Sequence, residues 1–383
     1  MRIRLLGIPS LVSVFALTLA APPLPAAPPP PLKTFEVHAD GRITFRYRDA
    51  HAAKVALNFE GAGKPLPMVR SEDGVWTATT PPQAPQIYYY SFDADGEPRL
   101  DPQNPTQKPN LISFFRGNLV TVPGRTPQPW EPADIPHGTV HHHMYTTKIV
   151  TGLPGNQSNY FVYTPPGYDP KASSRYPVLY LLHGWSDLAL GWTEVGKANL
   201  ILDHLIAKGL AQPMIVVMPL SYGEMSFVAT WETWDDAAAR GRNFSLFERA
   251  LLQEVMPRAE SAYAISRTPT DRAITGLSMG GYESVTIGLN HPELFSWVGG
   301  FSAAVQALDY DKDLPATAPK GNALRLLWIA CGTGEELIEP NRKLTTWLKQ
   351  RHFPVTPIET PGAHTYMVWR ENLVSFASLL FRK

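Results

Sequence analysis

Short runs in which apolar and polar residues alternate occupy the chain between residues 34 and 124. The clearest of these runs are 42–48, 55–59, 75–79 and 87–92. An alternation with a period of two predicts half-buried β-strands. Asp-Gly pairs, which favour tight turns, stand beside the runs at 40–41, 73–74 and 95–96. Several short strands separated by turns predict an immunoglobulin-like β-sandwich over residues 34–124.

The pattern changes in the second part of the chain. The runs 177–182 and 214–218 are almost entirely apolar, which is typical of parallel strands covered on both faces. Further strands are expected at 272–275, 297–301 and 324–330, and helices at 244–255, 341–350 and 366–382. Strands that alternate with helices predict an α/β fold with a mainly parallel sheet. We assign this domain to residues 138–383 and a proline-rich linker to 125–137.

The first residues are typical of an export signal. Two arginines precede an apolar run, 5–20, that ends in a small-x-small sequence, as cleavage sites do. We interpret residues 1–20 as a signal peptide and 21–33, rich in proline and alanine, as a spacer. Cleavage a few residues later and an uncleaved anchor helix are the alternatives. The expected protein is secreted or periplasmic, with no membrane span in its mature chain.

Composition excludes several classes of protein. Apolar residues make up 44% of the chain, which excludes a disordered protein. Basic and acidic residues number 34 each, so no basic excess is available to bind the phosphates of nucleic acid. The single Cys cannot form a disulfide within the chain. The sequence carries no indication of the oligomeric state.

The strongest chemical signal is the pentapeptide Gly-Leu-Ser-Met-Gly at 276–280. It follows a predicted strand, 271–275, and precedes a predicted helix, 282–290, which is the setting of a nucleophile elbow. In such a turn the serine hydroxyl is exposed, and the glycines let strand and helix approach closely. We predict Ser278 as a catalytic nucleophile, with an ordinary glycine-rich turn as the alternative.

A serine nucleophile needs a histidine base and an acid that orients the base. In this type of fold the order along the chain is Ser, acid, His. His364 lies in a loop ahead of the last predicted helix and is the preferred base, since His291 ends a helix and His352 precedes a strand. The acid is expected at a strand end, where Glu335 and Glu336 are both candidates. A solvated acidic pair is the alternative interpretation.

The oxyanion formed during acyl transfer needs backbone N–H donors. One should be the N–H of Met279, directly after the nucleophile. The other should come from the loop after the strand at 177–182, where Trp185 is the first candidate and Gly184 the second. We interpret His183, in the same loop, as a residue that shapes the loop.

Three further features have two interpretations each. Residues 141–143 are all His, but only alternate residues share a face of a strand, so we expect a strand rather than a metal site. Trp231 and Trp234 belong to a long loop and either form an aromatic wall of the substrate site or pack within the loop. Trp76 and the tyrosines at 88–90 either form a glycan-stacking platform, or alternate members of the group fill the sandwich core or face the neighbouring domain.

The catalytic motifs together resemble those of the esterase-D-type α/β-hydrolase family. They are the segments 182–184, 276–281, 331–333 and 362–364, with Trp369-Arg370. This family includes bacterial feruloyl esterases, some acetyl xylan esterases, siderophore esterases and mycolyltransferases. The resemblance implies a triad of Ser278, Glu335 and His364, in which Glu335 occupies a position that is usually Asp.

The sandwich region resembles carbohydrate-binding module family 48. The matching segments are 38–46, 73–76, 87–92 and 101–105. Such modules often precede esterases, and the resemblance implies a domain that packs beside the active site. Esterases with this arrangement most resemble the feruloyl and xylan-ester group.

These observations predict an exported serine carboxylic-ester hydrolase that releases feruloyl or acetyl groups from xylan, a plant cell-wall polysaccharide. Ser278 attacks the ester carbonyl, His364 takes the hydroxyl proton, and Glu335 orients His364. Neither a metal nor a cofactor is expected. The alternatives are a siderophore esterase or acyltransferase of the same family, and a glycan-binding protein whose hydrolase domain is inactive.

Overall fold

The computed structural model describes residues 32–321 and 323–382. The predicted signal peptide and most of the spacer lie outside these residues. From Lys33 on, the described residues form one compact unit, so the boundary at 125–137 stays a prediction. Among the described residues, no helix combines the length and the apolarity that a membrane crossing requires.

Two antiparallel sheets form the first part of the described chain. One has the strand order β1-β2-β6-β5; the other has the order β4-β3-β7-β10-β9, with β8 paired to β7. The strands are β1 (Phe35–Val37), β2 (Ile43–Arg48), β3 (Val55–Phe59), β4 (Leu66–Pro67), β5 (Val69–Arg70), β6 (Val75–Thr79), β7 (Gln86–Ala94), β8 (Glu97–Arg99), β9 (Gln107–Lys108) and β10 (Gly117–Val122). The four predicted strands correspond to β2, β3, β6 and β7.

The two sheets enclose one apolar core, which makes this part a β-sandwich. Phe45 of β2 and Trp76 of β6 pack there with Tyr88 and Tyr90 of β7, and all four side chains are buried. Trp76, Tyr88 and Tyr90 therefore belong to the core and form no exposed platform. Since side chains alternate along a strand, Tyr89 points out of the sandwich.

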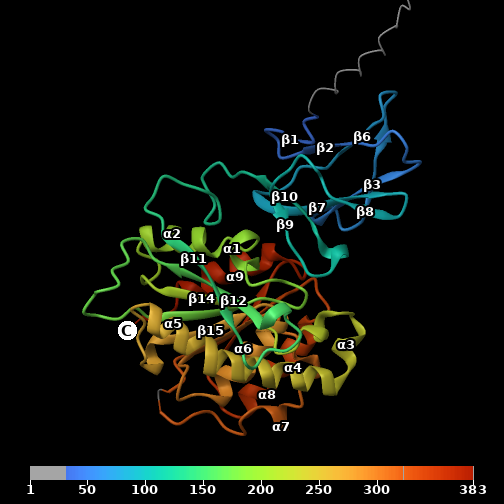
Figure 1. Cartoon of the computed structure of the whole chain (residues 1–383). Coiled ribbons are helices and arrows are strands. Elements are labelled where there is room, and N and C mark those ends of the chain that lie inside the picture. Colours follow the sequence, from blue (N-terminus) through green and yellow to red (C-terminus); the bar gives the residue numbers. More distant parts are fainter. Residues whose placement is uncertain (1–31, 322, 383) are drawn as a thin grey trace, which may run out of the picture. The chain divides into compact units, whose positions relative to one another are not determined.

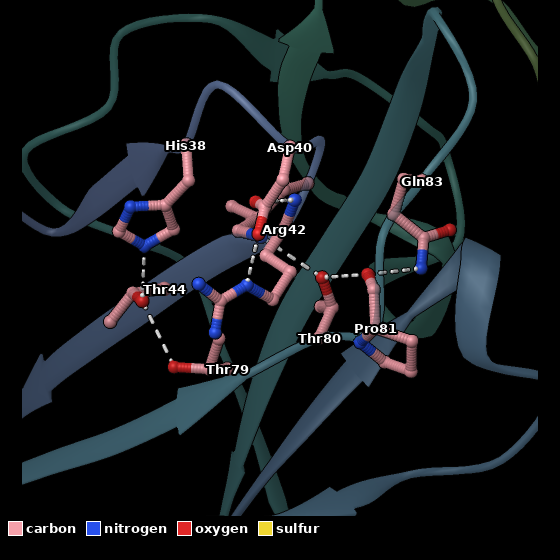
Figure 2. Close-up of polar contacts among 9 residues, drawn as sticks. His38, Asp40, Arg42, Thr44, Thr79, Thr80, Pro81 and Gln83 are labelled. Atoms are coloured by element: carbon pink, nitrogen blue, oxygen red, sulfur yellow. Dashed lines mark hydrogen bonds and ion pairs between the residues drawn. The ribbon is translucent and has the colours of Figure 1, made fainter.

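Polar side chains join β1, β2 and β6 at one end of the sandwich (Figure 2). Thr44 Oγ1 of β2 lies 2.9 Å from Thr79 Oγ1 of β6 and 2.8 Å from His38 Nε2. The Ile43 N–H donates to Thr80 Oγ1 at 3.0 Å. These contacts pair the polar groups of neighbouring strands and thereby support their register.

An eight-stranded sheet forms the second part. Its order is β11-β12-β14-β13-β15-β16-β17-β18. The strands are β11 (Thr139–Thr146), β12 (Gln157–Thr164), β13 (Val178–Leu182), β14 (Ile215–Pro219), β15 (Arg272–Gly276), β16 (Trp297–Phe301), β17 (Leu326–Gly332) and β18 (Val355–Thr360). From β14 to β18 the neighbours are parallel, whereas β11 and β12 pair antiparallel. The predicted mainly parallel sheet is confirmed.

Helices cover both faces of this sheet (Figure 1). They are α1 (Gly191–Glu194), α2 (Ala198–Ala207), α3 (Glu232–Asp235), α4 (Ala237–Ala250), α5 (Met256–Ala262), α6 (Met279–Asn290), α7 (Tyr310–Asp313), α8 (Ile338–Gln350) and α9 (Tyr366–Ala377). Helices α2 and α9 pack on one face, and α4, α5, α6 and α8 on the other. Successive residues of β13 contribute alternately to the two cores, which explains why its sequence is apolar throughout.

Candidate active site

Ser278 lies in a sharp turn between β15 and α6. Its backbone angles are φ 52° and ψ −114°, a conformation that a residue with a side chain adopts only when its surroundings enforce it. The Ser278 N–H donates to the carbonyl of Phe301 at 2.9 Å, and its own carbonyl accepts from the Ala304 N–H at 3.0 Å. These bonds tie the turn to β16 and its following loop and hold the strained conformation in place.

Two glycines allow this turn. A Cβ atom on Gly276 would lie 2.5 Å from the carbonyl oxygen of Gly280, and one on Gly280 would lie 2.5 Å from that of His183. Either side chain would force α6 away from the strands that it touches. The pentapeptide therefore forms the close strand–turn–helix bend that its glycines permit.

Glu335 and His364 form a hydrogen-bonded pair. The Glu335 side chain, which follows β17, is 2% exposed, and its Oε2 accepts from His364 Nδ1. Its Oε1 accepts from Ser302 Oγ at 2.6 Å and from the Gly332 N–H at 2.7 Å. Burial favours a higher pKa for the Glu335 carboxyl, but these bonds and the charge of His364 hold the pKa below its ordinary value. Glu336, in contrast, is exposed.

Trp369 of α9 supports the same pair. Its Nε1–H donates to Ser302 Oγ at 3.0 Å, and its ring meets the His364 ring edge-on with 4.8 Å between centroids. His364 lies in the loop between β18 and α9, and its side chain is 38% exposed. The imidazole is thus oriented on its Nδ1 side and accessible elsewhere.

Ser278, Glu335 and His364 line one cavity of about 530 Å³. Within the described residues, the only hydrogen bond of the His364 ring is the one to Glu335, so Ser278 Oγ is not bonded to it. Catalytic hydrogen bonds are often long without substrate and shorten in the complex. The cavity thus brings together a hydroxyl, an imidazole and a carboxylate, the three groups that a serine acyl transfer uses.

Two backbone N–H groups close to Ser278 have no partner among the described residues. One belongs to Met279, which is the first residue of α6 and so has no acceptor within its helix. The other belongs to Trp185, in the turn after β13, and Trp185 lines the cavity. A Cβ on the neighbouring Gly184 would lie 3.4 Å from the Ser278 Cβ, so this turn is packed directly against the serine.

His183 is buried behind the same turn. Its Nδ1–H donates to the Gly184 carbonyl at 2.8 Å, and its Nε2 accepts from the Ser221 N–H at 2.9 Å. Burial lowers the pKa of His183 to about 4, so the ring is neutral at physiological pH. Both ring nitrogens are used to connect the ends of β13 and β14.

Trp231 and Trp234 both line the cavity but differ in exposure. Trp231 is 59% exposed and meets Trp185 edge to face, with 4.8 Å between ring centroids. Trp234 is buried and packs against Phe227 and Phe244. Trp231 is therefore free to contact a ligand, whereas Trp234 mainly supports the loop.

The cavity also receives side chains that no sequence motif indicated. From the sandwich these are Glu60, Lys108, Asn110, Phe115 and Leu119, and the α/β part adds Asp187 and Tyr366. Ile87, Tyr89 and Arg370, which belong to sequence segments named above, line the cavity as well. An alternating pattern does not distinguish a strand position that faces solvent from one that faces a neighbouring part of the protein. The tyrosines at 88–90 are the exception, because consecutive residues of a strand point to opposite faces: Tyr88 and Tyr90 fill the core and Tyr89 faces the cavity.

The histidines at 141–143 lie on β11 and do not line the cavity. His142 stacks on Phe161 with 4.2 Å between centroids, and His143 stacks on Tyr160 with 4.9 Å. Over residues 32–321 and 323–382, no group of three His, Cys, Asp or Glu side chains is arranged to hold a metal ion.

A family model described as "Putative esterase" matches residues 152–378. Among curated proteins, an endo-1,4-beta-xylanase/feruloyl esterase of Xylanibacter ruminicola is 30% identical over 355 residues. The match covers 90% of this chain and 46% of that protein, so the chain spans about half the length of this relative.

Two solved structures have a similar fold. A ferulic acid esterase of Anaeromyces mucronatus, in complex with ferulic acid, has a TM-score of 0.57 at 21% identity, covering 73% of this chain and 98% of its own. An enterochelin esterase of Shigella flexneri has a TM-score of 0.65 at 16% identity, covering 90% of this chain and 94% of its own. At these identities the likeness concerns the fold, and the predicted α/β-hydrolase fold preceded by a β-sandwich is confirmed.

Proposed function

The chain belongs to the esterase family, and on that premise we propose that it is a serine carboxylic-ester hydrolase whose triad is Ser278, His364 and Glu335. The observation that carries the proposal is the bond between Glu335 and His364 on the cavity that Ser278 also lines. The strained turn at Ser278 adds to it, since such strain is retained where function requires it.

In this mechanism His364 Nε2 takes the Ser278 proton as Oγ attacks the ester carbonyl carbon. The carbonyl oxygen becomes an oxyanion, and the N–H groups of Met279 and Trp185 stabilise its charge. The tetrahedral intermediate collapses, the C–O bond to the alcohol breaks, and His364 gives the proton to the leaving oxygen. Water, activated in the same way, then hydrolyses the acyl-serine and restores Ser278. No metal or cofactor enters any step.

Glu335 acts on His364 and not on the substrate. An ionised carboxylate at Nδ1 keeps the proton on that nitrogen, leaves Nε2 free as base, and stabilises the imidazolium that forms. The lowered pKa of Glu335 keeps it ionised near neutral pH. Glutamate in place of the usual aspartate is compatible with this role because its oxygens reach His364, Ser302 and the Gly332 N–H together.

The proposed substrates are feruloyl or acetyl esters of xylan, so the proposed partner is an ester-substituted plant polysaccharide. A relative that is 30% identical carries the name of a xylanase and feruloyl esterase. Trp231 offers an exposed indole ring on the cavity wall, and aromatic rings favour stacking with other rings. Export by a cleaved signal peptide, to the periplasm or outside the cell, belongs to the same proposal.

The resemblance of the sandwich to carbohydrate-binding module family 48 stays a prediction. Because Trp76, Tyr88 and Tyr90 are buried in the core, any glycan binding by the sandwich would depend on other side chains. The placement of Tyr89 on the cavity supports a role for the sandwich at the active site.

Replacing Ser278 by Ala tests the proposal. We expect turnover of 4-nitrophenyl acetate to fall by about 10⁴-fold or more, as for other serine nucleophiles. Ser375→Ala, at an exposed position of α9, is the matched control and should keep wild-type turnover. Full activity of the Ser278 variant would disprove the assignment. A panel of methyl ferulate, acetylated xylan and a triester siderophore then identifies the ester.

A further inference from the structure

The sandwich supplies one wall of the cavity that holds the catalytic side chains. Its polar residues are Glu60, Lys108 and Asn110, its aromatic residues are Tyr89 and Phe115, and its aliphatic residues are Ile87 and Leu119. A sandwich that served only to anchor the protein to a glycan would not need such residues on the active-site cavity.

Arg370 fixes this wall to the α/β part. Its Nη2–H donates to the Ile87 carbonyl at 2.6 Å, its Nε–H to Gln86 Oε1 at 3.0 Å, and its Nη1–H to the Val195 carbonyl at 2.8 Å. Arg370 is 1% exposed and belongs to α9, as Trp369 does. The wall and the catalytic histidine are therefore positioned by the same helix.

Tyr89 presents its ring to the cavity in a fixed orientation. Its hydroxyl donates to the Arg116 carbonyl at 3.1 Å, and its backbone N–H donates to Glu60 Oε2 at 2.9 Å. The ring lies against β10, where a Cβ atom on Gly117 would come within 2.1 Å of it. An aromatic surface held in this way favours a flat apolar ligand beside it.

Lys108 and Glu60 add a donor and an acceptor next to that ring. Lys108 Nζ lies 5.1 Å from the centroid of Tyr89, and within the described residues its ammonium makes no hydrogen bond. Glu60 uses Oε2 for the Tyr89 N–H, while its Oε1 has no partner among the same residues. A hydroxyl group on an aromatic ring matches these three residues, because it donates one hydrogen bond and accepts another.

We propose that Glu60, Tyr89 and Lys108 form a subsite for the phenolic hydroxyl of an aromatic acyl group. The inference rests on the proposed function and selects hydroxylated aromatic acids over acetyl as the acyl part of the substrate. The phenol donates to Glu60 Oε1 and accepts from Lys108 Nζ, with its ring beside Tyr89. An acetyl group has no ring or hydroxyl to offer these three residues.

The electrostatic surroundings agree with a site that is filled by a neutral phenol. Burial raises the pKa of the Glu60 carboxyl, and the hydrogen bond from the Tyr89 N–H and the charges of Arg370 and Lys108 oppose this rise. The Lys108 ammonium also opposes the rise in the pKa of Asp187 that burial causes. The charge of Lys108 therefore already compensates the charges of the Glu60 and Asp187 carboxylates. An uncharged hydroxyl group adds no further charge to the cavity that would need compensation.

The test compares methyl 4-hydroxycinnamate with methyl cinnamate, which differ by this hydroxyl alone. In the wild type we expect kcat/KM to favour the hydroxylated ester by at least about tenfold, because buried polar groups left unpaired penalise the other ester. In Lys108→Met and in Glu60→Gln the ratio of the two kcat/KM values should fall about tenfold. Lys64→Met, at an exposed position of the sandwich, should keep the wild-type ratio.

Several results would overturn the subsite. One is a ratio of the two kcat/KM values near one in the wild type, and another is an unchanged ratio in both variants. A third is an effect of Lys108→Met that is seen only with feruloylated arabinose, because the wall would then bind the sugar and not the phenol. Thermal unfolding of Lys108→Met and Glu60→Gln verifies that the compared variants are folded. A wild type that hydrolyses neither cinnamate nor 4-nitrophenyl acetate contradicts the proposed function itself, so the two failures are distinguishable.

Discussion

Asn110 Nδ2 donates a 3.1 Å hydrogen bond to Asp187 Oδ1 and so joins the sandwich to the turn that follows β13. The neighbouring Leu111 N–H donates to the Ser186 carbonyl at 2.8 Å. Ser186 has a positive φ of 69°, which a residue with a side chain seldom adopts. Trp185, the candidate oxyanion donor, directly precedes it. The sandwich therefore braces the turn on which transition-state stabilisation is proposed to depend.

We predict that Asn110→Ala lowers kcat about tenfold with little change in KM. The loss of one complete oxyanion donor typically costs 10²–10³-fold, and a displaced donor should cost less. An interaction made mainly in the transition state appears in kcat and not in KM. Initial rates with 4-nitrophenyl acetate at several concentrations measure both constants.

Gln103→Ala is the control for Asn110→Ala, because Gln103 is exposed in the same part of the sandwich. It should behave as the wild type. An Asn110 variant that unfolds at a lower temperature yet keeps its full kcat would show that the bond to Asp187 supports stability alone.

The parts of the fold that the sequence predicts correctly are those with a long, regular pattern. β13 is apolar on both faces, which predicts a buried strand, and the glycines around Ser278 predict the turn. β10, in contrast, is buried at five of its six positions, so it shows no alternation, and strands of two residues such as β9 have no period at all. The helix expected at 366–382 ends at Ala377, and the residues directly after it form turns. Because residues 379–381 are still apolar, the sequence pattern does not show where the helix ends.

Within the candidate site, the residues that belong to a short sequence motif could be predicted, whereas those that reach the site through the packing of distant segments could not. Ser278 and His364 stand in motifs that can be recognised within a few residues. Glu335 and Glu336 are neighbours of identical chemistry, and only the direction of the side chain distinguishes the one bonded to His364. Lys108 becomes part of the cavity through the docking of the sandwich, which no local pattern encodes.

We predict that Glu335→Gln lowers kcat/KM by about 10³–10⁴-fold, because an amide in place of the carboxylate favours the wrong imidazole tautomer. Glu336→Gln is the matched control and should stay close to the wild type, since Glu336 is exposed. Hydrolysis of methyl ferulate by the two variants measures the difference. A larger loss in the Glu336 variant would reverse the assignment of the acid.

We predict that Arg370→Met destabilises the protein by roughly 3–5 kcal/mol, because buried acceptors are left without their charged donor. The affected acceptors are the carbonyls of Ile87 and Val195 and Gln86 Oε1. Burial lowers the pKa of Arg370 to about 10, so it is charged in the folded protein at neutral pH. Urea unfolding measures the loss, with Arg325→Met at an exposed position as control. Equal midpoints for both variants would contradict the prediction.

Glu283 of α6 has a side-chain carboxyl group that is buried without a hydrogen-bond partner among the described residues. Its two carboxyl oxygens have no hydrogen-bond partner among the described residues, and the residue is 1% exposed. Burial raises the pKa of this carboxyl well above its ordinary value. The folded chain therefore keeps the proton at pH values where the unfolded chain has released it.

This proton makes the stability depend on pH in a definite direction. Below about pH 4.3, the ordinary value for Glu, both states are protonated and nothing is lost. Above it the free energy of unfolding falls by up to about 1.4 kcal/mol per pH unit for this group, because only the folded state retains the proton. Glu283→Gln removes this contribution, so its free energy of unfolding should fall less steeply than that of the wild type. Urea unfolding at several pH values measures both slopes, and Glu336→Gln should keep the wild-type slope. Parallel curves for the wild type and Glu283→Gln between about pH 5 and 7 would show that Glu283 ionises in the folded protein.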